Sequence, residues 1–128
     1  MTDAPDGLRY SPDHLWIRLA PEGVARIGLT DFAQESLGDI IAVTMPNVGD
    51  DLEPGQACGD VESTKSVSDL VAPVRATVTA TNGALEDQPD LVNSDPYRGG
   101  WLLEARLHSD AGVADLLDAD AYGRLIGR

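Results

Sequence analysis

Residues 59–74 read GDVESTKSVSDLVAPV, and this stretch carries the strongest structural signal in the chain. Two β-prone runs, Gln56–Glu62 and Val67–Val71, flank the polar segment Ser63-Thr64-Lys65-Ser66. Runs of this kind separated by a few polar residues are typical of a β-hairpin. A serine at the first position of the segment also favours a β-turn. The sequence therefore predicts a hairpin that holds Lys65 at its tip, with the amine projecting into solvent.

The rest of the chain repeats the pattern of short apolar runs between turn residues, which is typical of an all-β domain. The other predicted strands are His14–Leu19, Val24–Leu29, Ile40–Met45, Val74–Thr81 and Trp101–Leu107. The predicted helices are Asp31–Leu37, Ala111–Leu117 and Ala119–Ile126.

Capping residues support the first of these helices. Thr30 or Asp31 is suited to cap its N-terminus, and Gly38 is suited to end it. Residues 82–100 are predicted to be turns, and the turn at residues 20–23 joins the first two strands. Since no linker divides the chain, we expect residues 1–128 to form a single β-rich domain whose C-terminal helices pack on a sheet.

Charge and hydropathy exclude several classes of function. The net charge is −13, from 22 acids and 9 bases, and such a field repels nucleic acid and anionic lipid. No run of about 18 apolar residues occurs, so no membrane-spanning helix is predicted. The acidic, polar N-terminus resembles neither a secretory signal nor a transit peptide. We therefore expect a cytoplasmic protein, and the strong negative charge favours a monomer.

Lys65 is the only lysine among the nine basic residues, and the other eight are arginines. A GC-rich genome explains the scarcity of lysine, because arginine replaces it wherever only positive charge matters. It does not explain the lysine that remains. An amine can form an amide or a Schiff base, whereas a guanidinium cannot be acylated under mild conditions. Lys65 is therefore a candidate for chemistry that requires an amine.

Other chemical signals are weak. Cys58 is the only cysteine, so no intrachain disulfide can form, and we interpret it as a small buried residue in a reducing compartment. His14 and His108 are far apart in the sequence, and neither is at metal-ligand spacing from another histidine or a cysteine. No metal site is therefore predicted. No nucleophile elbow, P-loop or dinucleotide-binding motif occurs. No catalytic residue is predicted, and the chain is not expected to be an enzyme.

A set of motifs distributed along nearly the whole chain resembles the biotinyl/lipoyl carrier domains and, more narrowly, the H-protein family of glycine cleavage systems. The lysine hairpin is preceded by Gly49-x-x-Leu52-x-x-Gly55 and followed by Ala72-Pro73. The remaining matching segments are residues 10–16 (YSPDHLW), 27–34 (IGLTDFAQ), 37–40 (LGDI), 61–65 (VESTK), 91–97 (LVNSDPY), 100–102 (GWL) and 116–122 (LLDADAY). Any one segment is weak evidence, but together and in this order they are highly specific.

The resemblance implies a mainly β, barrel-sandwich hybrid fold of two small antiparallel sheets with short flanking helices. It implies lipoic acid in amide linkage to Lys65, and a carrier that moves the aminomethyl group and the reducing equivalents of glycine. The implied partners are a pyridoxal-phosphate glycine decarboxylase (P protein), a folate-dependent aminomethyltransferase (T protein), a flavin dihydrolipoamide dehydrogenase (L protein) and a lipoylating enzyme. By the same resemblance, Glu62 is assigned to recognition and docking, and Asp69 to the surroundings of the arm. Asp60 and Asp69 are either further recognition residues or ordinary solvated strand-end residues.

Two positions depart from the family pattern. Leu15 stands where the family usually has a glutamate that lines a cleft for the loaded arm, so weaker protection of the arm is expected unless Asp13 or Asp69 replaces that carboxylate. Ala76 stands where the family usually has glycine. If that position requires a positive φ, Ala76 is strained by about 1 kcal/mol, and recognition by the lipoylating enzyme would suffer.

Other functions remain open on the sequence. Biotin acceptors usually have methionine on both sides of the lysine, whereas Thr64 and Ser66 flank Lys65 here. An unmodified structural or regulatory protein and a lipoyl relay that donates its group to other enzymes are the further alternatives. A Schiff-base enzyme is the weakest of them, because an exposed hairpin tip cannot desolvate the amine and lower its pKa.

Overall fold

The computed structural model describes residues 7–20, 23–108, 113 and 116–127. Its strands are β1 (Arg9–Tyr10), β2 (Leu15–Ala20), β3 (Val24–Leu29), β4 (Ile40–Thr44), β5 (Asp51–Leu52), β6 (Ala57–Ser63), β7 (Val67–Val71), β8 (Ala76–Thr81) and β9 (Leu103–Leu107). Its helices are α1 (Asp31–Leu37), α2 (Ala84–Asp87), α3 (Leu91–Ser94) and α5 (Ala119–Leu125).

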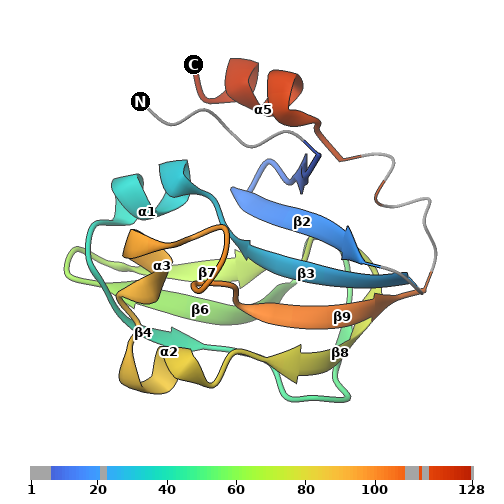
Figure 1. Ribbon diagram of the computed structural model, residues 1–128, viewed down its shortest axis with the longest axis horizontal. Coiled ribbons are helices and arrows are strands. Elements are labelled where there is room, and N and C mark those ends of the chain that lie inside the picture. Colours follow the sequence, from blue (N-terminus) through green and yellow to red (C-terminus); the bar gives the residue numbers. More distant parts are fainter. Residues whose placement is uncertain (1–6, 21–22, 109–112, 114–115, 128) are drawn as a thin grey trace.

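The strands form two antiparallel sheets. The larger has six strands in the order β1-β2-β3-β9-β8-β5, and the smaller has three in the order β4-β6-β7. Helices α1, α2 and α3 lie at one end of the sheets, and α5 lies beyond β2 at the outer side (Figure 1). The predicted mainly β class, with two antiparallel sheets and a C-terminal helix, is confirmed.

The main core lies between the two sheets. Successive side chains of a strand point to opposite faces, so each strand contributes alternate residues to this interior. The six-stranded sheet supplies Ile17, Ile27 and Val78, and the three-stranded sheet supplies Val61 and Leu70, all at most 2% exposed. Each such side chain contributes about 1.5–3 kcal/mol of hydrophobic stabilisation on burial. This core fixes the position of the β6–β7 hairpin relative to the rest of the molecule.

A second, aromatic cluster covers part of the opposite face of the six-stranded sheet. Tyr10, Trp16 and Tyr122 are completely buried in it. The rings of Tyr10 and Tyr122 stack with 4.8 Å between centroids, and Leu117 forms an isolated bridge with Tyr10. The predicted packing of the C-terminal helix on the sheet is thereby confirmed.

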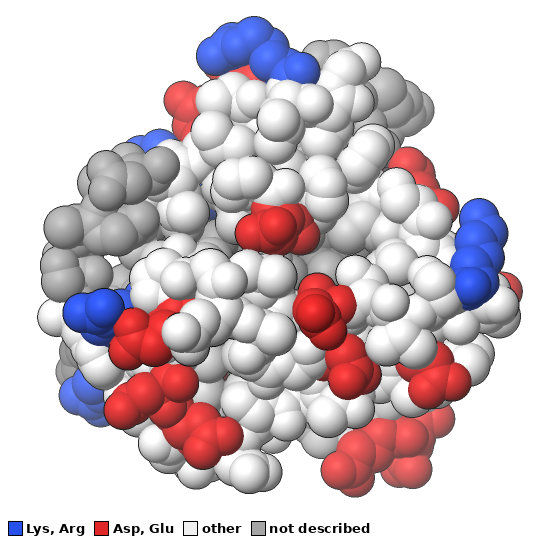
Figure 2. Space-filling model, turned by 180° about the vertical axis from the view of Figure 1, so that it is seen from behind, with Lys and Arg blue, Asp and Glu red and all other residues white. Residues whose placement is uncertain are grey.

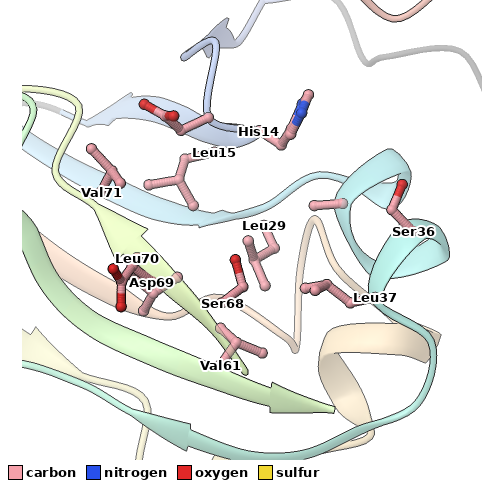
Figure 3. A pocket seen from close by; sticks show the side chains of 12 residues that line it. His14, Leu15, Leu29, Ser36, Leu37, Val61, Ser68, Asp69, Leu70 and Val71 are labelled. Carbon is pink, nitrogen blue, oxygen red and sulfur yellow. The ribbon is translucent and has the colours of Figure 1, made fainter. Parts of the chain in front are cut away.

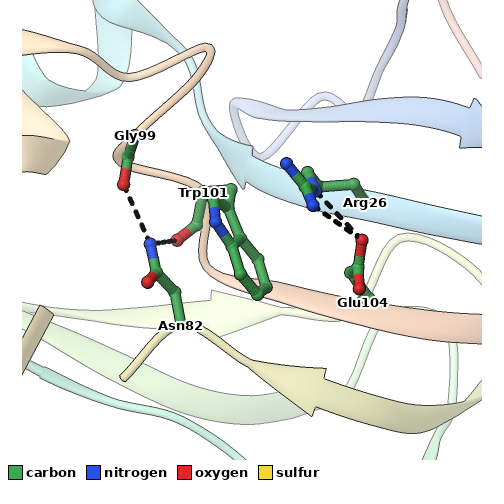
Figure 4. A network of polar contacts seen from close by, with 5 residues as sticks. All are labelled: Arg26, Asn82, Gly99, Trp101 and Glu104. Atoms are coloured by element: carbon green, nitrogen blue, oxygen red, sulfur yellow. Dashed lines mark hydrogen bonds and ion pairs between the residues drawn. The ribbon is translucent and has the colours of Figure 1, made fainter. Parts of the chain in front are cut away.

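The loop between β8 and β9 is held in place by Asn82. Its side-chain Nδ2 donates to the carbonyl oxygens of Gly99 at 2.9 Å and Trp101 at 2.8 Å (Figure 4). Because Asn82 is buried, these bonds satisfy a polar group that would otherwise be costly to remove from water. The loop contains α2 and α3, each of four residues, where the sequence predicted only turns.

The remaining predictions agree with the structure to within two residues at each boundary, with a few exceptions. The two-residue strands β1 and β5 were not predicted, because two residues give no periodicity to detect. The predicted helix Ala111–Leu117 and the turn at residues 20–23 fall partly outside the described residues. Leu117, at the end of that predicted helix, is instead part of a β-bridge. In the part of the chain that the structure describes, no helix is long and apolar enough to cross a membrane.

Candidate functional site

The β6–β7 turn is built around the side chain of Ser63. The Ser63 hydroxyl oxygen accepts hydrogen bonds from the backbone N–H groups of Lys65 and Ser66, both at 3.1 Å, and donates to the Ser66 carbonyl. The Ser63 N–H also donates to the same carbonyl at 2.8 Å. Ser63 is only 6% exposed, so solvent does not compete for these bonds. The turn that presents Lys65 is therefore well ordered, and the exposed lysine is at its tip as predicted.

A second segment braces the hairpin from the side. The N–H of Thr64 donates to the carbonyl of Asp39 at 3.0 Å, just beyond the end of α1. Gly38, with φ of 85°, ends that helix as predicted and donates its N–H to Gln34. A Cβ at Gly38 would lie 3.4 Å from Cε of Lys65. The lysine side chain thus lies along the backbone of Gly38 while remaining exposed.

A cavity of about 140 Å³ lies beside this segment, between α1, the start of β2 and the β6–β7 strands. Its apolar lining comprises Leu15, Leu29, Ala33, Leu37, Val61, Leu70 and Val71. Its polar lining comprises Asp13, His14, Ser36, Ser68 and Asp69. The side chains of Leu15, Leu29 and Leu37 converge on the interior, and Asp69 lies on β7 at one side (Figure 3). Because Ser36 and Leu37 precede Gly38 in the chain, the Lys65 side chain is next to the segment that forms one wall.

His14 has an unusual conformation at the rim of the cavity. Its φ is 71°, the left-handed region, and it is the only non-glycine residue with positive φ in the described part of the chain. Its Nδ1 lies 2.9 Å from the hydroxyl of Tyr122. Burial lowers the pKa of His14 from its ordinary value, and the nearby Asp13 carboxylate partly offsets this. The imidazole itself points away from the centre of the cavity (Figure 3).

The acids near Lys65 lie on the outward face of the three-stranded sheet. Asp60 and Asp69 are directly opposite each other across β6 and β7, and Glu62 is opposite Val67 two rows nearer the tip. Glu62 and Asp69 are exposed and Asp60 is half-buried. Seen from behind, the molecule shows carboxylates spread across its surface and basic side chains mainly at the margin (Figure 2). The structure therefore brings all three predicted acids to the hairpin that bears Lys65.

The two departures from the family pattern have different outcomes. Leu15 is 3% exposed and belongs to the main core as well as to the cavity wall. The cavity wall is therefore apolar at the position where the family usually has a glutamate. The strain considered for Ala76 is not found, because its φ is not positive. Ala76 is a fully buried residue of β8 that pairs with Leu52 and Leu107, in the other sheet from the lysine hairpin.

Comparison with known proteins agrees with this arrangement. A family model described as glycine cleavage H-protein matches residues 8–127. The chain belongs to this family. It is 54% identical over 127 residues to a glycine cleavage system H protein of Mycobacterium leprae (strain TN), covering 95% of this chain and 96% of the relative. It is 50% identical over 125 residues to the H protein of Mycolicibacterium vanbaalenii, covering 95% of both chains.

A solved structure gives the same result at the level of the fold. The crystal structure of a glycine cleavage system H protein from Mycobacterium marinum superposes with a TM-score of 0.90 at 39% identity, covering 98% of this chain and 100% of that one. Members of the H-protein family are lipoyl carriers, so this chain is a carrier component of a glycine cleavage system rather than a catalyst.

Sequence reasoning missed the contact between His14 and Tyr122, which are 108 residues apart. The only available signal was that both residues fall within matching family segments, at 10–16 and 116–122. No local pattern indicates that the two segments meet.

Proposed function

We propose that Lys65 carries a lipoyl group in amide linkage, and that the whole chain acts as one carrier domain. One observation carries this proposal. The single lysine of the chain stands on an ordered, exposed turn next to a mainly apolar cavity. An exposed amine is accessible to a modifying enzyme, and an apolar cavity beside it suits the hydrocarbon part of a long acyl arm.

The lipoyl dithiolane supplies a sulfur that accepts a carbon unit and a disulfide that takes up two electrons. The chain supplies position and shelter. The Ser63 turn and the Thr64–Asp39 bond hold the attachment point in one place relative to the cavity. A docked carrier then makes each transfer effectively intramolecular, which raises the effective concentration of the arm at the partner's active site without tight binding.

The cavity is proposed to shelter the loaded arm between partners. Leu15, Leu29 and Leu37 give it an apolar lining, while Asp69 and Asp13 add carboxylates to that lining. A carried amine is cationic at neutral pH, so a border carboxylate stabilises it. Leu15 supplies no charge, and we therefore expect the arm to be protected less well here than with a glutamate at that position.

The partners are proposed to be the glycine decarboxylase, the aminomethyltransferase, the dihydrolipoamide dehydrogenase and the lipoylating enzyme. The outward face of the three-stranded sheet supports this. Asp60, Glu62 and Asp69 lie on the two strands that flank the Lys65 turn, and none of the three has an ion-pair partner among the described residues. Acylation of Lys65 would remove the only basic group of the β6–β7 hairpin. Basic surfaces on the partners would be steered toward it.

Intact mass and peptide mapping of the protein from a lipoate-replete host test the attachment. We expect a lipoyl mass increment on Lys65 and complete loss of it in Lys65→Arg, which keeps the charge but cannot be acylated. As a control, Arg75→Lys adds a lysine just before β8, away from the β6–β7 turn, and should remain unmodified there. A biotinyl increment or an unmodified wild-type chain would contradict the proposal.

The carrier function is tested by reconstitution with the three enzymes. Lipoylated wild-type protein should support glycine-dependent NADH formation, and Lys65→Arg should support none. A wild-type chain that becomes lipoylated but supports no turnover would separate the attachment from the proposed shuttle.

A further inference from the structure

One side of the cavity is formed by the tight loop Ser11–Leu15, in which His14 has a positive φ. The loop is closed by backbone bonds from Ser11 N–H to the Leu15 carbonyl at 2.9 Å and from His14 N–H to the Ser11 carbonyl at 3.0 Å. The Ser11 hydroxyl accepts from the Leu15 N–H at 3.2 Å. A non-glycine residue in this conformation is held at a cost in energy, so other contacts must keep it in place.

One of those contacts comes from the far end of the chain. The hydroxyl of Tyr122, on α5, lies 2.9 Å from Nδ1 of His14 and 2.7 Å from Oγ1 of Thr30. Tyr122 is completely buried and its ring stacks on Tyr10. The hydroxyl is therefore fixed by packing of the ring and is not free to follow the loop. The His14 ring also packs against Phe32, with 5.0 Å between centroids.

Thr30 connects the same hydroxyl to the other wall of the cavity. Its side chain caps α1 by accepting from the Ala33 N–H at 3.2 Å. Helix α1 contributes Ala33, Ser36 and Leu37 to the cavity, whereas the His14 loop contributes Asp13 and Leu15. A single buried hydroxyl thus bonds to the segments that form two facing walls.

We propose that Tyr122 is a positioning residue for the arm, by which helix α5 holds the two walls of the cavity at a fixed separation. This inference rests on the proposed function, since it assumes that the cavity shelters the loaded arm. Tyr122 does not line the cavity or touch the cargo. It acts through His14 on one side and Thr30 on the other.

Tyr122→Phe tests the proposal, because it removes the hydroxyl and leaves the ring to stack on Tyr10. Lipoylated protein is loaded with glycine by the decarboxylase and isolated, and release of formaldehyde is followed. We expect release at least about fivefold faster than from the wild type, because the hydroxyl makes two hydrogen bonds and the loss of each ordinary one corresponds to a factor of about five. The rate of loading by the decarboxylase should not change.

Tyr97→Phe is the matched control. The Tyr97 hydroxyl donates to Asp31 Oδ1 at 2.8 Å and accepts from the Asp31 N–H at 3.1 Å, so it too contacts the start of α1. It bonds to neither His14 nor the cavity lining. We expect wild-type formaldehyde release from this variant. Equal acceleration in both variants, or none in Tyr122→Phe, would overturn the proposal.

A double-mutant cycle with His14→Gly makes the test specific for the proposed contact. Glycine tolerates the positive φ and has no side chain to bond with the Tyr122 hydroxyl. If the two residues act through one bond, the double variant should release formaldehyde no faster than the faster single variant. Effects that multiply would overturn the proposal. His14→Gly also serves alone if Tyr122→Phe does not fold.

Amide hydrogen exchange of the unmodified proteins distinguishes failure of this inference from failure of the proposed function. Tyr122→Phe should increase exchange in residues 11–15 and at the start of α1, and Tyr97→Phe should leave residues 11–15 unchanged. If the loaded wild type releases formaldehyde as fast as a lipoylated peptide, the shelter proposed for the cavity is wrong. Unchanged exchange at residues 11–15 in Tyr122→Phe would show that the Tyr122 hydroxyl does not hold the His14 loop in place.

Discussion

Each sheet has a pair of like charges on directly opposed residues, but only one of the two pairs is compensated by other contacts. On the six-stranded sheet Arg18 is opposite Arg26, and on the three-stranded sheet Asp60 is opposite Asp69. Like charges in this position destabilise a sheet. The arginines are compensated within the molecule, whereas the aspartates have no ion-pair partner among the described residues.

Both arginines have compensating contacts. Arg26 forms an ion pair with Glu104 at 3.0 Å and lies over the Trp101 ring at 4.6 Å (Figure 4). Arg18 donates to the Tyr97 carbonyl at 3.0 Å and lies 5.0 Å from the centre of the Trp16 ring. The opposed arginines are thus compensated within the molecule. On the proposed function, the carboxylates of the three-stranded sheet remain available to basic surfaces of the partners.

The largest predicted effect tests how tightly the outer face of the six-stranded sheet is packed. A Cβ at Gly28 would lie 2.6 Å from two atoms of the Trp16 ring, which is buried and cannot move away. Gly28→Ala should therefore lower the free energy of unfolding by about 1–3 kcal/mol. Gly83→Ala is the control, since a Cβ there has open space. Urea unfolding checks both, and equal effects at the two glycines would contradict the packing argument.

The next effect tests the compensated pair. Glu104→Gln removes the carboxylate that neutralises Arg26 and leaves the opposed arginines to repel each other. Both side chains are partly exposed, so we expect a loss of about 0.2–1 kcal/mol in the free energy of unfolding, reduced at high salt. Turnover with the partner enzymes should be unchanged. A large loss of turnover would show that the six-stranded sheet also takes part in docking.

For the Asp60–Asp69 pair, removing one charge should change the free energy of unfolding in the opposite direction. Asp60→Asn removes the repulsion with Asp69 and should raise the free energy of unfolding by about 0.2–1 kcal/mol. The same change should lower the kcat/KM of a partner enzyme and weaken its dependence on salt, because a steering charge is lost. Asp51→Asn, on the six-stranded sheet, is the matched control for turnover. A destabilised Asp60→Asn protein would refute the idea that stability is given up for docking.

The sequence predicted the elements whose signal is local. Helix α1 was found from residue 31 to residue 37 because Thr30 caps it and Gly38 stops it, and both signals lie within one turn of its ends. The lysine hairpin was found because two β-prone runs flank a short polar segment. The family resemblance added the two-sheet architecture, which no local pattern contains.

What the sequence did not provide depends on contacts between distant segments. Helices α2 and α3 are four residues long, too short to show a helical period, and they are stabilised by packing and by the bonds of Asn82. The positive φ of His14 is likewise set by its surroundings, including a tyrosine 108 residues away. The apolar character of Leu15 was visible, but its membership of the core required the fold.

The smallest predicted effect is the pH dependence that His14, at the rim of the cavity, confers on the free energy of unfolding. Burial holds its pKa below the ordinary value near 6.5, so the native state favours the neutral ring while the unfolded state protonates more readily. The contribution of His14 to stability is therefore complete above about pH 6.5. It is lost as the pH falls from there toward the lowered native pKa.

Urea unfolding at pH 7.5 and pH 5.5 measures this loss, with His14→Asn as the variant that lacks the titrating group. The decrease in unfolding free energy between the two pH values should be smaller in His14→Asn than in the wild type. Asp13→Asn is the informative second variant, because the Asp13 carboxylate raises the pKa of His14. Without it the native pKa falls further, and the decrease should be larger than in the wild type. If Asp13→Asn instead reduced the decrease, the carboxylate and not the imidazole would dominate titration at this rim.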